Sequence, residues 1–507
     1  MDKEKSTTTA ANSFSSGSTI KKPNKLSSLS SSTASEPSPV AAAITTTNST
    51  AMLPGRVHRI LQNFLLIWLD TNIDESKQDF INSLTQLRHL VASITTFTGA
   101  QECVNFLRDI KKEKVFMIVS GSLGQQILPE IHAWPQLDSI YVFCGNPSLH
   151  EQWAKTMFKV KGVHNDIEPI CKALQSDRER CDRSLISISF HGTDALFMYT
   201  QLVKEVLLEI DDDDAKSIKE LVEYCRLQDD IAEDEIKQIE QEYHSHTPIW
   251  WYTAPYFIHS MLNRGLRVLD VDIILKMGFF IRHLHRHIEQ LHRQQQSKAP
   301  TGLLQVYRGQ GLSLQDFEKM KQTKGGLMSF NNFLSTSRNR DISLKNFARP
   351  AALDTNSVGI LFVMTIDPKV CDASSSLTPF ADVTKVSYYQ GQEKETLFST
   401  HTIFRIDKIE RIVDDHTDRL WQVNLTFTGN DHHDLNTLAA HIRKKLSLMT
   451  TGWSRLGRIL SKIGQSAKAE QLYQLLLKEA SSDNDQANYN SQFGRVFFLQ
   501  QHWDGIL

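Results

Sequence analysis

The chain has 507 residues, 40% of them hydrophobic and 22% charged, which is enough for about three globular domains. Its 56 Lys and Arg residues nearly balance 58 Asp and Glu residues, and the formal net charge of -2 excludes the broad basic field of a nucleic-acid-binding or membrane-surface protein. The six cysteines form neither a CxxC motif nor a Cys/His cluster with zinc spacing, so we expect reduced thiols and no metal. No apolar stretch follows Met1, and the apolar runs are shorter than the ~18 residues of a membrane helix. We therefore expect a cytoplasmic protein.

The first 52 residues are dominated by Ser, Thr, Ala and Pro and contain hardly any large apolar side chains. Such a segment cannot bury enough surface to offset the entropy of ordering. We predict a disordered tail over residues 1–52.

Residues 53–205 show short apolar runs separated by amphipathic helical stretches. The predicted strands are 64–69, 91–97, 115–119 and 139–143. Short buried strands alternating with helices are typical of a parallel sheet covered on both faces. The pattern resembles a flavodoxin-like or receiver-like three-layer α/β domain, whose role the sequence does not reveal.

Two features at the predicted strand ends of this domain suggest sites. Asp70 ends the first strand, but Ser120 and Gly121 stand where a receiver domain would carry its phosphoacceptor aspartate. Gly121 and Gly124 would suit a small anion site at a helix N-terminus, although two glycines fall short of a nucleotide fingerprint. We favour a tight turn here.

A helical region is predicted from about 216 to 296. The acidic run 211–214 lacks the spacing of a calcium loop, so we expect a linker whose charges favour the following helix N-terminus. Phe280, Leu284, Ile288 and Leu291 form an apolar stripe at helical spacing, which predicts a core-facing side. His283 and His287 are four residues apart beside it, but the surrounding arginines favour a solvated face over a metal site.

The pattern then changes to short strands with few helices between them. The predicted strands are 303–308, 332–337, 358–366, 395–398, 402–406 and 421–427. This arrangement indicates an antiparallel sandwich or split barrel. Together with the helical region it makes one α+β domain over 206–430.

Three polar motifs interrupt these strands. They are Val306-Tyr307-Arg308-Gly309, Phe333-Leu334-Ser335-Thr336-Ser337 and Gln392-Glu393-Lys394-Glu395-Thr396-Leu397-Phe398. Gly309 would let a ligand approach the backbone. Because residues two apart share a face of a strand, Glu393 and Glu395 point into one cleft while Lys394 points away.

In this order, the motifs resemble the Arg, Ser-Thr-Ser and Glu-x-Glu signature of the arginine-specific mono-ADP-ribosyltransferases, the family of vertebrate ecto-enzymes and clostridial-type toxins. The segments 250–252 and 261–264 of the helical region also fit that layout, and the resemblance covers about 215–430. It implies a helical subdomain followed by a split antiparallel β-sandwich, with NAD as the substrate and no metal.

The resemblance also implies roles for the motif residues. Glu395 would be the catalytic carboxylate, Ser335 would hold it in position, and Glu393 would engage the guanidinium of the acceptor arginine. Arg308 would offer a fork of donors to the NAD phosphates, and the Gly309 backbone would meet the nicotinamide amide.

Further NAD contacts are indicated by spacing alone. Phe347 lies where the family often places an aromatic ring against nicotinamide, and Asn332 precedes Ser335 where some members have an NAD-contacting Asn. Tyr388 and Tyr389 precede the glutamate pair, either in a loop that meets the protein acceptor or in a buried turn.

From about 450 the sequence resembles a tetratricopeptide repeat. Trp453, Leu456, Gly457, Leu460, Gly464, Ala469 and Tyr473 have its spacing. We predict two antiparallel helices between about 450 and 480, with Ala469 at their close approach. A second repeat would begin near Phe493. Residues 431–507 are then a linker and the start of a helical array, which implies a peptide or protein partner.

The sequence thus predicts an enzyme that transfers ADP-ribose from NAD to an exposed arginine of a protein acceptor. NAD glycohydrolysis, in which water replaces the acceptor, is the rival activity, and the first glutamate of the pair favours arginine transfer. An inactive interaction scaffold is the rival from another class. Neither nucleic acid nor a membrane is expected as a partner.

Overall fold

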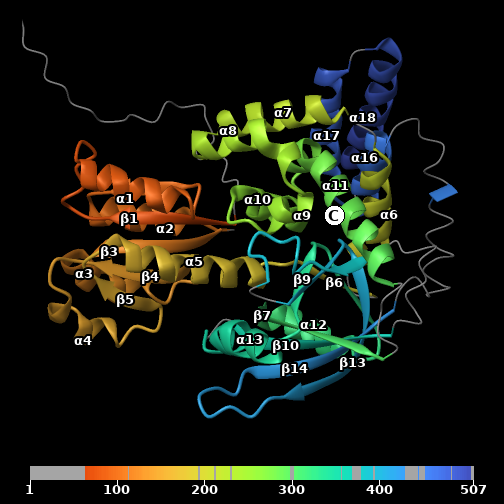
Figure 1. Cartoon of the computed structure of the whole chain (residues 1–507). Helices are drawn as coiled ribbons and strands as arrows, with labels where there is room; N and C mark the ends of the chain where they lie inside the picture. Colours follow the sequence, from red (N-terminus) through yellow and green to blue (C-terminus); the bar gives the residue numbers. More distant parts are fainter. Residues whose placement is uncertain are drawn as a thin grey trace, which may run out of the picture. The chain divides into compact units, whose positions relative to one another are not determined.

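The computed structural model describes residues 63–111, 113–191, 195–210, 213–228, 231–296, 302–354, 357–367, 378–391, 394–428, 443–444, 452–480 and 482–503 (Figure 1). The chain divides into two compact units, Met1–Val57 and His58–Leu507, and all described residues belong to the second. The tail predicted over 1–52 lies outside the described residues.

A five-stranded parallel sheet forms the first part of the described chain. Its strands are β1 (Phe64–Leu69), β2 (Ile94–Phe97), β3 (Lys114–Ser120), β4 (Leu137–Phe143) and β5 (Val160–His164). They lie in the order β2-β1-β3-β4-β5. The sequence missed β5, whose residues 160–164 include a Gly and a Lys and are only partly buried.

Helices cover both faces of this sheet. They are α1 (Gln78–Arg88), α2 (Ala100–Asp109), α3 (Gly121–Ile131), α4 (Glu151–Ala154) and α5 (Ile167–Ser184), with a 3-10 turn η1 (Pro147–Leu149). Alternate residues of β1 pack into two cores, one with α2 and α3 and the other with α1 and α5. Burial on both faces explains why the strands are continuous apolar runs, and it gives the expected three layers.

The space over Gly121 and Gly124 is filled by side chains. A Cβ on Gly121 would lie 2.4 Å from the ring of His150, and a Cβ on Gly124 would lie 3.1 Å from Trp153. Both glycines belong to the first turn of α3, so the expected tight turn between strand and helix is wrong, and they allow His150 and Trp153 to pack closely against the helix.

The next segment is helical. It contains α6 (Ala195–Glu209), α7 (Asp214–Arg226), α8 (Glu233–Glu242), η2 (Tyr243–Ser245), α9 (Pro248–Thr253), α10 (Phe257–Val268) and α11 (Val271–Gln296). Asp213 caps α7 by accepting from the backbone amides of residues 215 and 216. Phe280, Leu284 and Ile288 are buried, so the predicted apolar stripe is confirmed as core. His283 lies between Asp214, 3.0 Å away, and the Tyr243 hydroxyl, 2.9 Å away.

A nine-stranded sheet follows. Its strands are β6 (Ile188–Phe190), β7 (Leu304–Ser313), β8 (Leu327–Phe330), β9 (Leu334–Ser337), β10 (Ser357–Ile366), β11 (Phe380–Asp382), β12 (Glu395–Phe398), β13 (Thr402–Arg411) and β14 (Leu420–Phe427). Short helices α12 (Leu314–Gln322), α13 (Arg340–Ile342), η3 (Ser343–Ala348) and α14 (Arg349–Ala352) lie between strands. The strand order is β11-β12-β9-β7-β10-β14-β13-β8-β6.

This sheet is split between β9 and β7. The described strands pair in an antiparallel manner except for β10 and β14, which run parallel, a departure from the predicted antiparallel arrangement. Strands β7 and β9 share a single residue pair, Tyr307 with Ser337. Strand β6 joins β8 of this sheet although it precedes residue 206, the expected start of the domain.

The C-terminal segment contains α16 (Gly452–Lys462), α17 (Ser466–Glu479) and α18 (Asp483–Trp503). Ala469 is fully buried, and a Cβ on Gly457 would lie 2.4 Å from the Tyr473 ring. The two predicted helices and the burial of Ala469 are present, whereas assignment to the tetratricopeptide family stays a prediction. One helix, α18, runs through Phe493, where a second repeat was expected to begin.

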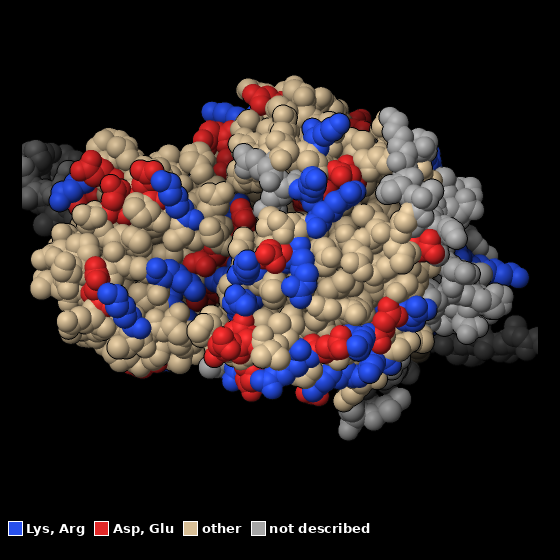
Figure 2. Space-filling model, turned by 60° about the horizontal axis from the view of Figure 1, so that its bottom comes forward, with Lys and Arg blue, Asp and Glu red and all other residues tan. Residues whose placement is uncertain are grey.

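Charges of both signs alternate over the face shown in Figure 2, in line with the formal net charge of -2. None of the described helices is both long and apolar enough to span a bilayer.

Candidate active site

Strands β9 and β12 bring Ser335 and Glu395 together. The two strands pair antiparallel with Ser335 opposite Leu397, so Glu395, two residues from Leu397, projects from the same face. The Ser335 hydroxyl donates to Glu395 Oε1 at 2.5 Å. A hydroxyl donor on one carboxylate oxygen fixes the orientation of the carboxylate and leaves the other oxygen directed elsewhere.

Arg308 on β7 lies beside this pair and is 1% exposed. Its Nη1 donates to the Ser335 carbonyl at 2.8 Å, its Nη2 to the Arg183 carbonyl at 3.0 Å, and its Nε to Gln310 Oε1 at 2.9 Å. Burial, and next the charge of Arg183, lower the pKa of Arg308 to about 9. Three of its five N–H donors therefore hold protein groups, which differs from the predicted fork presented to NAD phosphates.

The three side chains line a single cleft of about 300 Å³. This volume is at the lower end of the range of about 300 to 1,000 Å³ that small-molecule sites have. Segments far apart in the sequence contribute to the lining: α5, α9, α10, β7, β9, the loop before β12, and β12 itself. Arg308 lies in the middle of β7, which continues to Ser313 beyond the predicted strand end at residue 308. The structure thus brings Arg308, Ser335 and Glu395 to one place, while Glu393 lies outside the described residues.

Buried hydrogen bonds support the wall of the cleft. The Tyr252 hydroxyl donates to the Phe333 carbonyl at 3.2 Å, and the Tyr252 carbonyl lies 3.0 Å from His259 Nδ1. His259 Nε2 lies 2.9 Å from Asn263 Nδ2. Burial, followed by the charges of nearby arginines, lowers the pKa of His259 to about 4. A neutral His259 therefore fits this network as an acceptor toward Asn263.

Asn332 belongs to the same framework. It is fully buried, and its Nδ2 donates to the backbone carbonyl and the side-chain oxygen of Asn263 at 2.9 and 3.1 Å. Its Oδ1 accepts from the Ser187 amide at 3.4 Å. The side chain is thus engaged with α10 and with the segment before β6, and NAD contact by Asn332 stays a prediction that this structure does not favour.

Gly309 and Phe347 meet protein groups. A Cβ on Gly309 would lie 1.8 Å from the Ser343 carbonyl oxygen, so glycine is needed there for the close approach of η3, where the sequence had suggested a ligand. Phe347 is 7% exposed, and the Arg183 guanidinium lies 3.8 Å from its ring centroid. The ring face predicted to meet nicotinamide is thus covered by an arginine.

The two tyrosines before β12 are exposed, by 38% for Tyr388 and 37% for Tyr389. The Tyr388 amide donates to Thr253 Oγ1 at 2.8 Å, and its ring packs against Trp250. Tyr389 lines the cleft, where its hydroxyl accepts from Gln175 at 3.4 Å. Their exposure argues against a buried turn, whereas contact of this loop with a protein acceptor stays a prediction.

Helix α5 supplies cleft residues that the sequence did not suggest: Gln175, Arg178, Glu179, Asp182 and Arg183. Their spacing of three and four residues places them on one helix face. A charged helix face is usually solvated, so nothing in the sequence distinguished this one. Within the described ranges, no group of three or more His, Cys, Asp or Glu side chains is placed to hold a metal ion.

No protein-family model matches the sequence, and no curated protein matches it significantly. Several solved structures are similar at low identity. Plx2a, an ADP-ribosyltransferase toxin from Paenibacillus larvae, has 20% identity, 42% coverage of this chain and 96% of its own, and a TM-score of 0.21. The ADP-ribosyltransferase HopU1 of Pseudomonas syringae has 16% identity, 47% and 100% coverage, and a TM-score of 0.27. The C3 exoenzyme of Clostridium limosum has 11% identity, 41% and 94% coverage, and a TM-score of 0.25. Because these TM-scores are low, we build the proposed function on the residues of the cleft itself.

Proposed function

We propose that this chain transfers ADP-ribose from NAD to an arginine side chain of a protein acceptor and releases nicotinamide. The observation that carries the proposal is the Ser335–Glu395 hydrogen bond of 2.5 Å in a cleft that also holds Arg308. A carboxylate held by a hydroxyl beside buried guanidinium groups suits a ligand that is anionic and develops positive charge during reaction.

The bond that breaks joins the nicotinamide nitrogen to C1′ of the ribose. Its electron pair leaves with nicotinamide, and the ribose passes through an oxocarbenium-like cation, as in glycoside cleavage. Glu395 would stabilise that cation electrostatically, with Ser335 holding the carboxylate in place. A guanidino nitrogen of the acceptor then bonds to C1′, and its proton passes to Glu393 and on to solvent.

The exposed loop at the cleft mouth supports a protein acceptor. Tyr389 lines the cleft and the neighbouring Tyr388 is exposed, and aromatic side chains are enriched where proteins bind one another. A glycohydrolase would replace the acceptor by water and would need neither this surface nor Glu393.

The test compares Glu395→Gln with Glu393→Gln. Glu395→Gln should lower both arginine transfer and NAD hydrolysis by ~100-fold or more, because it removes charge that acts in the transition state. Glu393→Gln should suppress transfer and leave NAD binding and slow hydrolysis largely in place. Nicotinamide release, measured with and without a guanidino acceptor such as agmatine, separates the two.

Each outcome distinguishes the candidates. If Glu393→Gln transfers to arginine as fast as the parent, the arginine specificity is wrong. If the parent hydrolyses NAD without any transfer, the protein is a glycohydrolase. If it releases no nicotinamide at all, the scaffold interpretation replaces both.

A further inference from the structure

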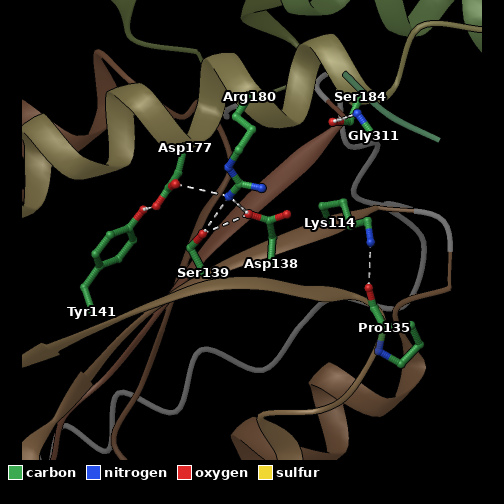
Figure 3. A network of polar contacts seen from close by, with 9 residues as sticks. All are labelled: Lys114, Pro135, Asp138, Ser139, Tyr141, Asp177, Arg180, Ser184 and Gly311. Atoms are coloured by element: carbon green, nitrogen blue, oxygen red, sulfur yellow. Dashed lines mark hydrogen bonds and ion pairs between the residues drawn. The ribbon is translucent and has the colours of Figure 1, made fainter. Parts of the chain in front are cut away.

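Helix α5 belongs to the five-stranded sheet yet lines the cleft of the second sheet. Arg180 on α5 donates to Asp138 Oδ1 at 2.7 Å and to Ser139 Oγ at 3.2 Å on β4 (Figure 3). At the end of the same helix, Ser184 Oγ accepts from the Gly311 amide on β7 at 3.2 Å. The helix is thus fixed at one side to the first sheet and at its C-terminus to the strand that carries Arg308.

Two arginines of α5 face the cleft. Arg183 is partly exposed, and its guanidinium carbon lies over the Phe347 ring, 3.8 Å from the ring centroid. Arg178 is 8% exposed and donates from Nη1 to the Leu90 carbonyl at 3.1 Å. Its buried Nε has no hydrogen-bond partner within the described part of the chain. A buried donor without a partner is costly, and a ligand acceptor would satisfy it.

These two arginines and Arg308 line the same cleft. All three lower the pKa of His259, after the larger effect of burial, and Arg183 also lowers that of Arg308. The carboxylates in the same lining are Glu179, Asp182 and Glu395. Burial raises the pKa of Asp182 to about 6, and the charge of Arg178 acts in the opposite direction. An anionic ligand between the guanidinium groups would relieve their mutual repulsion.

We propose that helix α5 of the first α/β domain completes the NAD site, with Arg183 and Arg178 holding the pyrophosphate of the dinucleotide. The inference rests on the proposed function and deepens it. It assigns the phosphate contact to a helix outside the transferase motifs instead of to Arg308, because three of the five Arg308 donors bind protein oxygens. Planar guanidinium groups match phosphate oxygens in pairs, and the contact with Phe347 restrains the Arg183 guanidinium at the cleft. The first domain then takes part in substrate binding.

The test measures NAD affinity of the full chain and of Arg183→Gln by titration calorimetry. Losing one charge-assisted pair should raise the Kd for NAD by about 10- to 100-fold and flatten its dependence on salt. Arg183→Lys, which keeps the charge without the fork, should fall between the two. Lys172→Gln is the matched control, since Lys172 lies on the same helix with its side chain 75% exposed, and its Kd should equal that of the parent. Inorganic pyrophosphate should compete with NAD for the parent, and it should compete more weakly for Arg183→Gln. The Kd for free nicotinamide, which has no phosphate, should be the same in both.

An unchanged Kd and salt dependence in Arg183→Gln would overturn the inference. Tighter NAD binding in that variant would also overturn it and would make α5 an element that occludes the cleft. Thermal melting of each variant identifies loss of folding, and if Arg183→Gln does not fold, Arg183→Lys and pyrophosphate competition on the parent decide. A parent that binds no NAD would reject the proposed function itself, a result distinct from parent and variant binding NAD equally.

Discussion

At the scale of single residues, Glu235 shows how burial changes the chemistry of a side chain. It lies on α8, is 6% exposed, and burial raises its pKa to about 8, with Arg178 acting in the opposite direction. His89 Nδ1 lies 3.7 Å from its carboxylate. A carboxyl group that stays protonated to about pH 8 in the folded chain but ionises near pH 4.5 when unfolded makes folding less favourable as pH rises.

We therefore predict that Glu235→Gln is more stable than the parent at pH 8.5, by up to a few kcal/mol. The amide resembles the protonated carboxyl, so the difference in unfolding free energy should shrink toward zero near pH 4.5. Urea unfolding at pH 4.5, 6.5 and 8.5 measures it. Glu233→Gln, an exposed position on the same helix, should show no such trend, and an equal trend in both variants would assign the effect to net charge.

The candidate site illustrates what single residues in a sequence can and cannot predict. The resemblance of the three motifs to a family signature indicated Ser335 and Glu395, and strand periodicity added only that residues two apart share a face of a strand. It could not indicate that Arg308 donates to the Arg183 carbonyl, since that contact depends on how α5 docks. Tertiary contacts of this kind have no periodic signal.

At the scale of elements, the α16–α17 pair depends on a close approach between Gly457 and Tyr473. Tyr473 is 1% exposed, and its hydroxyl donates to the Ser454 carbonyl at 2.9 Å. The ring therefore cannot move aside without losing this bond. A side chain at position 457 would force the two helices apart.

We predict that Gly457→Ala destabilises α16 and α17 by about 1 to 3 kcal/mol. Gly494→Ala is the matched change on α18, where an added Cβ meets nothing within 4 Å, and it should stabilise its helix by about 0.5 to 1 kcal/mol through propensity alone. Hydrogen exchange over residues 452–503 reports both local free energies. If both substitutions stabilise, the packing described for Gly457 is wrong.

Strands with a clear burial pattern were the most predictable parts of the fold. Strands β1, β10 and β12 fall within one residue of their predicted bounds, because their alternation or burial is unbroken. Strands β6 and β11 have three residues each and were missed. A three-residue strand is too short to show a sequence pattern of its own. Pairing with a neighbouring strand makes these segments extended: β6 pairs with β8, and β11 pairs with β12.

At the scale of the whole molecule, α5 connects the first sheet to the cleft, because it packs on that sheet and also lines the cleft. Burial would raise the pKa of Asp138, but Arg180 at 2.7 Å holds that pKa below its usual value. Asp177 links the same guanidinium to the Tyr141 hydroxyl. Arg180, which belongs to this network, lies about one helical turn before Arg183 on α5. Loss of its ion pair with Asp138 should therefore shift the C-terminal end of α5.

We predict that Asp138→Asn raises the KM for NAD several-fold while kcat stays close to that of the parent, because binding is weakened equally in the ground and transition states. Steady-state nicotinamide release measures both constants. Asp79→Asn, an exposed change on α1, should leave them unaltered. A drop in kcat at constant KM in Asp138→Asn would argue against a link through α5.

The single residue pair between β7 and β9 has a consequence for how the site is tested. It makes a seam in the sheet, with Ser335 and Glu395 on one side and Arg308 on the other. The hydrogen bond from Arg308 to the Ser335 carbonyl crosses that seam and links β7 to β9. Removing Arg308 would therefore weaken the contact between the two halves of the sheet as well as delete a positive charge. Loss of activity in an Arg308 variant can then reflect a change in the arrangement of the sheet. Variants that keep the Arg308–Ser335 hydrogen bond measure ligand recognition without that effect.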